Sequence, residues 1–169
     1  FKTWVDGGRF VYKPRHHSAG DLWRLEFYRS SIQIYSVLRE LKRKVFGLIF
    51  ETVLSRHDKV EYIKRAIENG FFVRLFFVCT TSPNINASRI VDRVMKGGHD
   101  VPIPKIISRY YQSIRNCQEL SSVVNRAYFY DNSIDNKDAR LLFRLSEGKL
   151  AKQYTDQIPE WARIILNLI

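Results

Sequence analysis

The chain of 169 residues contains no apolar run near the roughly 18–20 residues that a membrane-spanning helix needs. Its beginning does not show the basic and then apolar pattern of a secretory signal peptide. We therefore expect no membrane partner and a cytoplasmic location, with an organelle matrix as the alternative. The chain begins at Phe1 rather than Met, so we expect a processed or partial product.

Cysteine is scarce, and the two cysteines, Cys79 and Cys117, stand far apart. Cys79 lies in an apolar, strand-like stretch, and neither residue has the spacing of a metal-ligand pair. We expect two buried free thiols, which fits a reducing compartment. No other group of residues has the spacing of a metal site, and none is predicted.

The phosphate-binding glycine pattern G-x-x-x-x-G-K-[ST] is also missing. The only Gly-Lys pair, Gly148-Lys149, is followed by a leucine. In such a loop, backbone amides surround the phosphates, the lysine reaches the terminal phosphate and the hydroxyl binds Mg²⁺. The visible sequence therefore supplies no ATP-binding loop of this kind.

Acidic residues are few, 17 against 28 lysines and arginines, which leaves a net charge of +11. This balance favours polyanionic partners such as nucleotides, nucleic acid or an acidic protein surface, although a solvated basic surface remains the alternative. Hydrophobic residues make up 45% of the chain, enough for a folded domain with a real core.

The hydrophobic pattern predicts an α/β fold: a three-layer parallel sheet with flanking helices. We expect one domain over 1–169, with a basic segment and helix up to 44, a core over 45–133 and a C-terminal strand and helix over 134–169. The predicted helices are 21–44, 58–68 with Ser55 as N-cap, 86–96, 102–116, 117–124 and 159–168. The predicted strands are 45–52, 71–80, 127–130 and 139–146.

The aromatic residues of 71–77 admit two readings. Exposed aromatic rings could form a stacking platform for nucleic-acid bases. Their neighbours are apolar except for Arg74, as in a strand that is largely buried. We therefore predict that these rings pack in the core.

Candidate functional residues fall in two places. Glu51 lies at the carboxyl end of the strand predicted at 45–52, and ligands bind at the carboxyl ends of parallel strands. There it could accept a proton or orient a hydroxyl, or it could cap a loop or pair with an arginine. Arg89 and Arg93 share a helix face, and Arg109 follows a Gly-Gly-His-Asp-Val-Pro turn. Arginines on such a helical hairpin could bind a phosphate group through paired hydrogen bonds. The alternative is that the hairpin is a solvated basic surface.

Four segments in this order, FETVLS, GFFVRLFFVCTTSP, RIVDRVMKGGHDVPIPKIISRYYQSIRN and YFYDNS, resemble the zeta-toxin family of kinases. Its members are often labelled predicted P-loop or ABC-type ATPases. The resemblance covers residues 45–133, about half of the chain. It implies a P-loop kinase fold of the nucleoside-monophosphate-kinase kind, with residues 86–116 as a lid.

The resemblance further implies transfer of the γ-phosphate of ATP, with Mg²⁺, to a small-molecule hydroxyl such as that of a UDP-N-acetylamino sugar. It also implies an antitoxin protein as a partner. Three residues match the family's catalytic positions: Glu51, Arg93 and Arg109. Four match its acceptor-binding positions: Thr52, Ser55, His99 and Asp100. Arg89 matches an ATP-binding position. Val53 stands where many members have a second threonine, which leaves the acceptor open.

Two explanations account for the missing glycine loop. In the first, the ATP-binding half of the kinase lies upstream of Phe1, and the chain is N-terminally incomplete. In the second, the protein is a catalytically degenerate relative. It would then be a binding or structural module in a larger basic assembly that contains nucleic acid.

Overall fold

The computed structural model describes residues 9–11, 24–26 and 51–167. The chain divides into two compact units, Phe1–Thr52 and Val53–Ile169, and the predicted single domain stays a prediction. In the first unit, β1 (Arg9–Val11) pairs antiparallel with β2 (Arg24–Glu26). The helix predicted over 21–44 is therefore wrong at the residues of β2, where pairing with a distant strand overrides local helical spacing. The rest of that helix and residues 45–50 lie outside the described residues.

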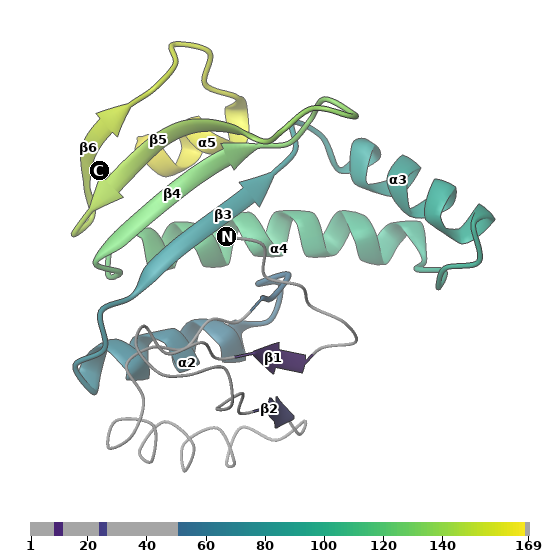
Figure 1. Cartoon of the computed structure of the whole chain (residues 1–169). Helices are drawn as coiled ribbons and strands as arrows, with labels where there is room; N and C mark the ends of the chain where they lie inside the picture. Colours follow the sequence, from purple (N-terminus) through teal and green to yellow (C-terminus); the bar gives the residue numbers. More distant parts are fainter. Residues whose placement is uncertain (1–8, 12–23, 27–50, 168–169) are drawn as a thin grey trace, which may run out of the picture. The chain divides into compact units, whose positions relative to one another are not determined.

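The second unit is a mixed α/β structure around a sheet in the order β3-β4-β5-β6 (Figure 1). β3 and β4 are parallel, whereas β4–β5 and β5–β6 are antiparallel. The strands are β3 (Arg74–Cys79), β4 (Arg126–Asp131), β5 (Arg140–Ser146) and β6 (Lys149–Gln153). The helices are α2 (His57–Glu68), α3 (Pro83–Met95), α4 (Ile103–Ser121) and α5 (Glu160–Leu166). The α/β class is confirmed, but only one pair of the described strands is parallel.

The antiparallel pair β5–β6 is a tight hairpin that the sequence pattern did not reveal. β5 and β6 are joined by Glu147 and Gly148, which both have positive φ angles, 50° and 75°. Two consecutive residues with positive φ match the twist of the flanking strands, as in a type I′ turn. β6 escaped prediction because its sequence, KLAKQ, lacks β-branched and aromatic residues.

α4 is a single helix of 19 residues, so the prediction of two helices, 102–116 and 117–124, is wrong. Its buried side chains continue through the expected break at helical spacing, and they include Ile106, Tyr110, Ile114, Cys117 and Leu120. Because one continuous apolar stripe faces the sheet, nothing in the packing requires the helix to end at Asn116.

α2 begins without the expected cap. Its N-cap is Arg56, whose side chain makes no capping hydrogen bond, so the prediction of Ser55 as N-cap is wrong. In α3, by contrast, the Ser82 side chain accepts a hydrogen bond from the Asn84 backbone at 3.2 Å, and Pro83 opens the first turn. Of the helices in the described ranges, none has both the length and the apolar character needed to cross a bilayer.

The core lies between the sheet and the layer that contains α4 and α5, behind the sheet in Figure 1. The rings of Phe129 and Phe143 stack at 4.4 Å, and Phe77 meets Trp161 edge to face at 5.6 Å. The opposite face is open: Phe72 and Phe76 are 57% and 59% exposed. The prediction of a largely buried β3 is therefore wrong, because no described helix packs on this second face.

Candidate functional site

The carboxyl ends of β3 and β4 lie side by side, since the parallel register pairs Cys79 with Asp131. Ligands of α/β proteins commonly bind at this edge. Thr80 follows β3 and is buried, and the Tyr110 hydroxyl of α4 donates to its carbonyl at 2.8 Å. The backbone N–H of Asn132 donates to the Cys79 carbonyl at 2.8 Å, which keeps the two strand ends together.

Ser133 links the chain segments that leave these two strands. Its Oγ accepts a hydrogen bond from the Thr81 backbone N–H at 2.8 Å. The same hydroxyl donates a hydrogen bond to the carboxylate of Asp131. The Asp131 side chain is only 9% exposed, and a guanidinium nitrogen of Arg140 lies 3.5 Å from its other oxygen. The carboxyl-end edge of the sheet therefore contains the nearly buried carboxylate of Asp131, in a turn held by hydrogen bonds.

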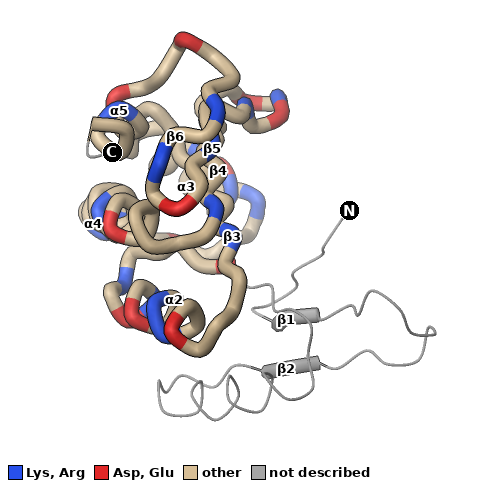
Figure 2. The backbone as a smooth tube through the Cα atoms, turned by 90° about the vertical axis from the view of Figure 1, so that its left-hand side faces the viewer, with Lys and Arg blue, Asp and Glu red and all other residues tan. Residues whose placement is uncertain are grey.

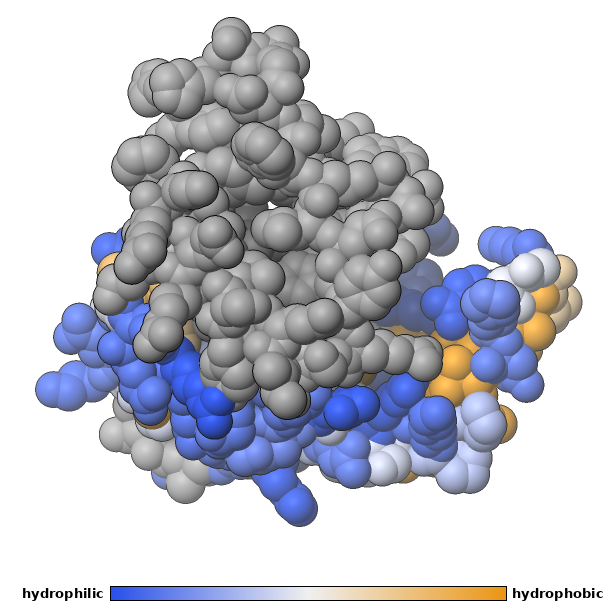
Figure 3. All heavy atoms as spheres, turned by 90° about the horizontal axis from the view of Figure 1, so that it is seen from below, coloured by the Kyte–Doolittle hydropathy of each residue, from blue (hydrophilic) through white to orange (hydrophobic). Residues whose placement is uncertain are grey.

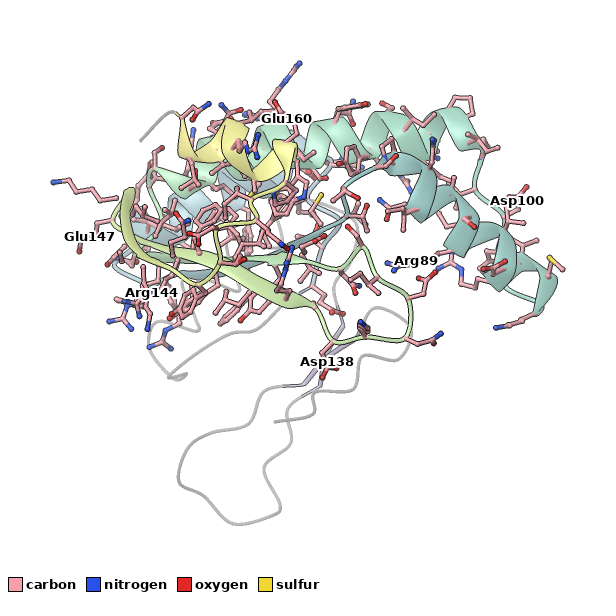
Figure 4. The ribbon with its side chains drawn as sticks, turned by 90° about the horizontal axis from the view of Figure 1, so that it is seen from above. Arg89, Asp100, Asp138, Arg144, Glu147 and Glu160 are labelled. Atoms are coloured by element: carbon pink, nitrogen blue, oxygen red, sulfur yellow. The ribbon has the colours of Figure 1, made fainter. Side chains whose placement is uncertain are left out.

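Arg89 fastens the helical hairpin of α3 and α4 to this edge. Its Nε and one terminal nitrogen donate to Oδ1 of Asp135 at 2.8 and 2.6 Å, and the other terminal nitrogen donates to the Asn132 carbonyl at 2.8 Å. Figure 4 shows the Arg89 side chain directed from α3 toward the loop that follows β4. The predicted ATP contact of Arg89 stays a prediction, and in this structure its guanidinium binds the protein itself.

The two glycines of the hairpin turn have distinct roles. Gly97 has a φ angle of 86° and donates to the Val94 carbonyl, while Gly98 donates to the Arg93 carbonyl, both at 2.9 Å. This pair of bonds is the Schellman pattern that ends many helices. A Cβ on Gly98 would lie 2.7 Å from Cγ and 2.9 Å from the carbonyl oxygen of Arg93. The turn therefore holds the backbone against the last turn of α3, where Arg93 lies.

The other predicted hairpin residues differ in their setting. Arg93 is exposed and Arg109 is half-buried, and neither guanidinium has a hydrogen-bond or ion-pair partner among the described residues. Both are therefore available to an anion. His99 and Asp100 are exposed in the turn, and Figure 4 places Asp100 at the far end of the hairpin. The structure does not bring these two residues to the strand ends.

Glu51 and Thr52 are exposed and follow no described strand. They end the first unit, whereas the arginines belong to the second, so their predicted partnership stays a prediction. Ser55 is half-buried at the start of the second unit, just before α2.

Leu54 is the strained residue of this region. It is 3% exposed and has a φ angle of 58°, a left-handed conformation that is uncommon for a residue with a Cβ. The buried side-chain amide of Asn116 in α4 donates to its carbonyl at 2.7 Å. Strained residues often cluster at functional sites, and this one lies three positions after Glu51.

One exposed cluster has metal-ligating side chains. Ligand atoms of His57, Glu61 and Glu119 all lie within 4.8 Å of one another. The Lys64 ammonium group, however, is 2.5 Å from Glu119 and 3.9 Å from Glu61. Its hydrogen bond lowers the pKa of Glu119 and holds the carboxylate ionised. Because a cation already neutralises the cluster, we interpret it as an ion-pair network between α2 and α4.

The feature that sequence reasoning missed is the open face of the sheet. Aromatic and basic side chains alternate with core residues along β3 and β4, so they gather on one side. β3 and β4 each begin with one arginine, and Figure 2 marks further lysines and arginines on the neighbouring strands β5 and β6. The arginines beside the aromatic residues, Arg74 and Arg126, are the sequence signal for this open face, and the prediction of core packing is wrong for Phe72 and Phe76.

Comparisons with known proteins add one relative. An uncharacterized protein of Haemophilus influenzae is 36% identical over 64 residues. The match covers 38% of this chain and 46% of that protein, so the chain spans less than half of its relative. No family model matches the sequence, and no solved structure matches it.

Proposed function

We propose that the chain forms the acceptor side and lid of a zeta-toxin-like kinase, which transfers the γ-phosphate of ATP to a hydroxyl of a UDP-N-acetylamino sugar or a similar small molecule. The observation that carries the proposal is the helical hairpin anchored at the joined ends of a parallel strand pair through Arg89. In this proposal β3 and β4 belong to a P-loop-kinase-like sheet, and residues 86–116 are its lid.

The described contacts suggest a division of labour among the arginines. Arg89 is engaged with Asp135 and Asn132, so it positions the hairpin. Arg93 and Arg109 lie on α3 and α4 without a partner among the described residues, so we assign them to the neutralisation of phosphate oxygens. Planar guanidinium groups suit this role because each can donate two parallel hydrogen bonds.

In the transfer, the acceptor oxygen forms a bond to the γ-phosphorus while the bond from that phosphorus to the β-γ bridging oxygen breaks. ADP leaves with the electron pair of the broken bond. Glu51 orients the acceptor hydroxyl and takes its proton, with Thr52 and Ser55 as further acceptor contacts. ATP and Mg²⁺ require a glycine loop that these 169 residues do not contain, so no described residue is assigned to them.

The partners and location follow from the same resemblance. An antitoxin protein would restrain the kinase, and the reaction would take place in the cytoplasm, which supplies ATP and UDP-sugars. The net charge of +11 supports a polyanionic ligand, whether ATP or a UDP-sugar.

Isothermal titration of the 169-residue chain with UDP-N-acetylglucosamine tests the proposal, because the chain is assigned the acceptor side of the kinase. We expect binding that is weakened about tenfold by Arg93→Ala or Arg109→Ala, since a hydrogen bond to a charged group contributes about 1.5–3 kcal/mol. Arg163→Ala in α5 removes an exposed arginine outside the hairpin and should leave binding unchanged. Absence of binding, or equal loss in all three variants, would refute the lid assignment.

A further inference from the structure

The open face of the sheet is built from two rows of paired residues. One row runs Phe76, Tyr128, Arg144 and Lys152 across the four strands, and the next runs Arg74, Arg126, Ser146 and Lys149. Residues paired in this way point to the same side of a sheet. Figure 4 shows Arg144 on the side of the strands away from α4 and α5. Aromatic and cationic side chains thus share one surface.

The aromatic rings on this surface form one stacked pair and one cation–π cluster. Phe76 and Tyr128 stack at 4.9 Å with their planes only 9° apart, and Phe76 is 59% exposed. Phe72 is 57% exposed and lies beneath two guanidinium groups, those of Arg74 at 5.1 Å and Arg126 at 5.7 Å. Exposed aromatic side chains beside guanidinium groups can stack with a planar ligand.

The charge on this surface has one sign. The two rows contain three arginines and two lysines and no aspartate or glutamate. In addition, Nε of Arg144 is buried and has no hydrogen-bond acceptor among the described residues. A helix or a second protein core that covered this face would have to desolvate several of these cations without supplying counter-charges, which is costly. An anionic occupant avoids that cost.

We propose that this face, defined by Phe72, Phe76, Tyr128 and the cations of the two rows, binds single-stranded nucleic acid. Unpaired bases stack on Phe72, Phe76 and Tyr128, while Arg74, Arg126, Arg144 and the lysines contact phosphates. Duplex nucleic acid does not expose base faces for such stacking and binds more weakly. The proposal is independent of the kinase assignment, because it uses none of the hairpin residues.

A further exposed apolar surface lies on the hairpin, where Val91, Met95 and Ile103 are exposed, and Figure 3 shows apolar atoms at its right. It contains no aromatic stack of this kind among the described residues. We therefore locate the nucleic-acid surface on the sheet rather than on the hairpin.

Fluorescence anisotropy with 5′-labelled 12-mers of oligo(U) and oligo(dT), at 50 and 150 mM KCl, tests the proposal on the 169-residue chain. We expect Phe76→Ala to weaken binding about tenfold and Phe76→Tyr to retain it, since base stacking on an aromatic ring has that magnitude. Arg144→Ala should weaken binding and lower the salt slope by about 0.7, the value for one phosphate contact of a single strand. Comparison of the two oligomers shows whether a 2′-hydroxyl contributes.

Three controls give the test its meaning. Arg163→Ala and Arg115→Ala each remove one exposed arginine outside this face and should change affinity little. Circular dichroism should show that Phe76→Ala is folded, as expected for a side chain that is more than half exposed.

Several results would overturn the proposal. They are the absence of binding at 50 mM KCl, equal affinity for a duplex, and unchanged affinity in both Phe76→Ala and Arg144→Ala. Sedimentation could instead show that the wild-type chain is a dimer and that Phe76→Ala dissociates it. If this variant also bound the oligonucleotides as well as the wild type does, the occupant of the face would be a second copy of the chain.

Discussion

Arg89 and Asp135, 46 positions apart, are joined by two hydrogen bonds of 2.8 and 2.6 Å to one carboxylate oxygen. This contact ties α3 to the loop between β4 and β5, and a third bond from Arg89 reaches the Asn132 carbonyl. Since α3 has no fully buried side chain, this arginine is a principal attachment of the helix.

Arg89→Ala should therefore loosen α3 and lower the free energy of unfolding by about 1 kcal/mol, a modest value because Asp135 is largely exposed. Hydrogen exchange should accelerate over residues 83–95, with urea unfolding giving the free energy. Arg93→Ala, one helical turn later, is the matched control. If both variants exchange alike, Arg89 does not attach the hairpin.

Gly98→Ala should distort the hairpin turn, because the new Cβ would lie 2.9 Å from the carbonyl oxygen of Arg93. We expect a loss of about 1–3 kcal/mol from this overpacking, measured by thermal or urea unfolding. At Gly97 a Cβ meets no atom within 4 Å, so Gly97→Ala should cost only the positive-φ penalty, about 1 kcal/mol. A Gly98→Ala protein as stable as the wild type would contradict the close approach.

Asn116→Ala removes the buried donor to the Leu54 carbonyl. Loss of one partner of a buried hydrogen bond costs about 1–3 kcal/mol, so this variant should unfold at a lower urea concentration. Gln112→Ala changes an exposed amide one turn earlier on α4 and should have little effect. Equal stability of the two variants would show that the bond does not hold Leu54 in its strained conformation.

Acid should weaken the contact between α2 and α4 through Glu119. The Lys64 hydrogen bond lowers the pKa of Glu119 below its ordinary value of 4.5, so the folded state binds fewer protons than the unfolded state there. The resulting stabilisation is present above pH 4.5 and is lost as the pH falls through the lowered pKa. Unfolding free energies measured from pH 6 to pH 3 should therefore decline more steeply in the wild type than in Glu119→Gln. Parallel declines would exclude this pair as a contributor.

Both thiols should resist alkylation in the native protein. Burial raises the pKa of Cys79 to about 11 and that of Cys117 well above its ordinary value, so little thiolate exists at neutral pH. A thiol reagent at pH 7.5 should react slowly with the folded chain and promptly with two thiols in guanidinium chloride. Rapid reaction of a native thiol would mean that this part of the core opens readily.

Local pattern was sufficient for several elements of the second unit. The helix predicted at 58–68 is α2, and the strands predicted at 71–80, 127–130 and 139–146 are β3, β4 and β5 with shifted ends. Helical spacing and long apolar runs arise from burial against neighbouring elements, so they are visible before the fold is known. The hairpin glycines were also placed correctly at the end of α3.

Pattern was insufficient wherever a partner distant in sequence decided the outcome. Residues 24–26 pair with β1 instead of continuing a helix, and α4 continues past Asn116 because its apolar stripe keeps facing the sheet. The antiparallel direction of β5 depends on the path of the loop that connects it to β4. The residues of β5 itself do not determine that path. The predicted site was divided for the same reason: Arg89 binds Asp135 and Asn132, whereas Arg93 and Arg109 have no partner in the part of the chain that the structure describes.

The sequence by itself determined the basic charge, the α/β class, the helical hairpin with its glycine turn and the absence of a phosphate-binding glycine loop, because these depend on composition and on neighbours along the chain. Only the tertiary structure decided which face of β3 is buried. Phe77 meets Trp161 in the core, while Phe76, the preceding residue, remains open beside Tyr128. Successive side chains of a strand point to opposite faces, and the position of the covering helices decides which of them becomes core and which becomes surface.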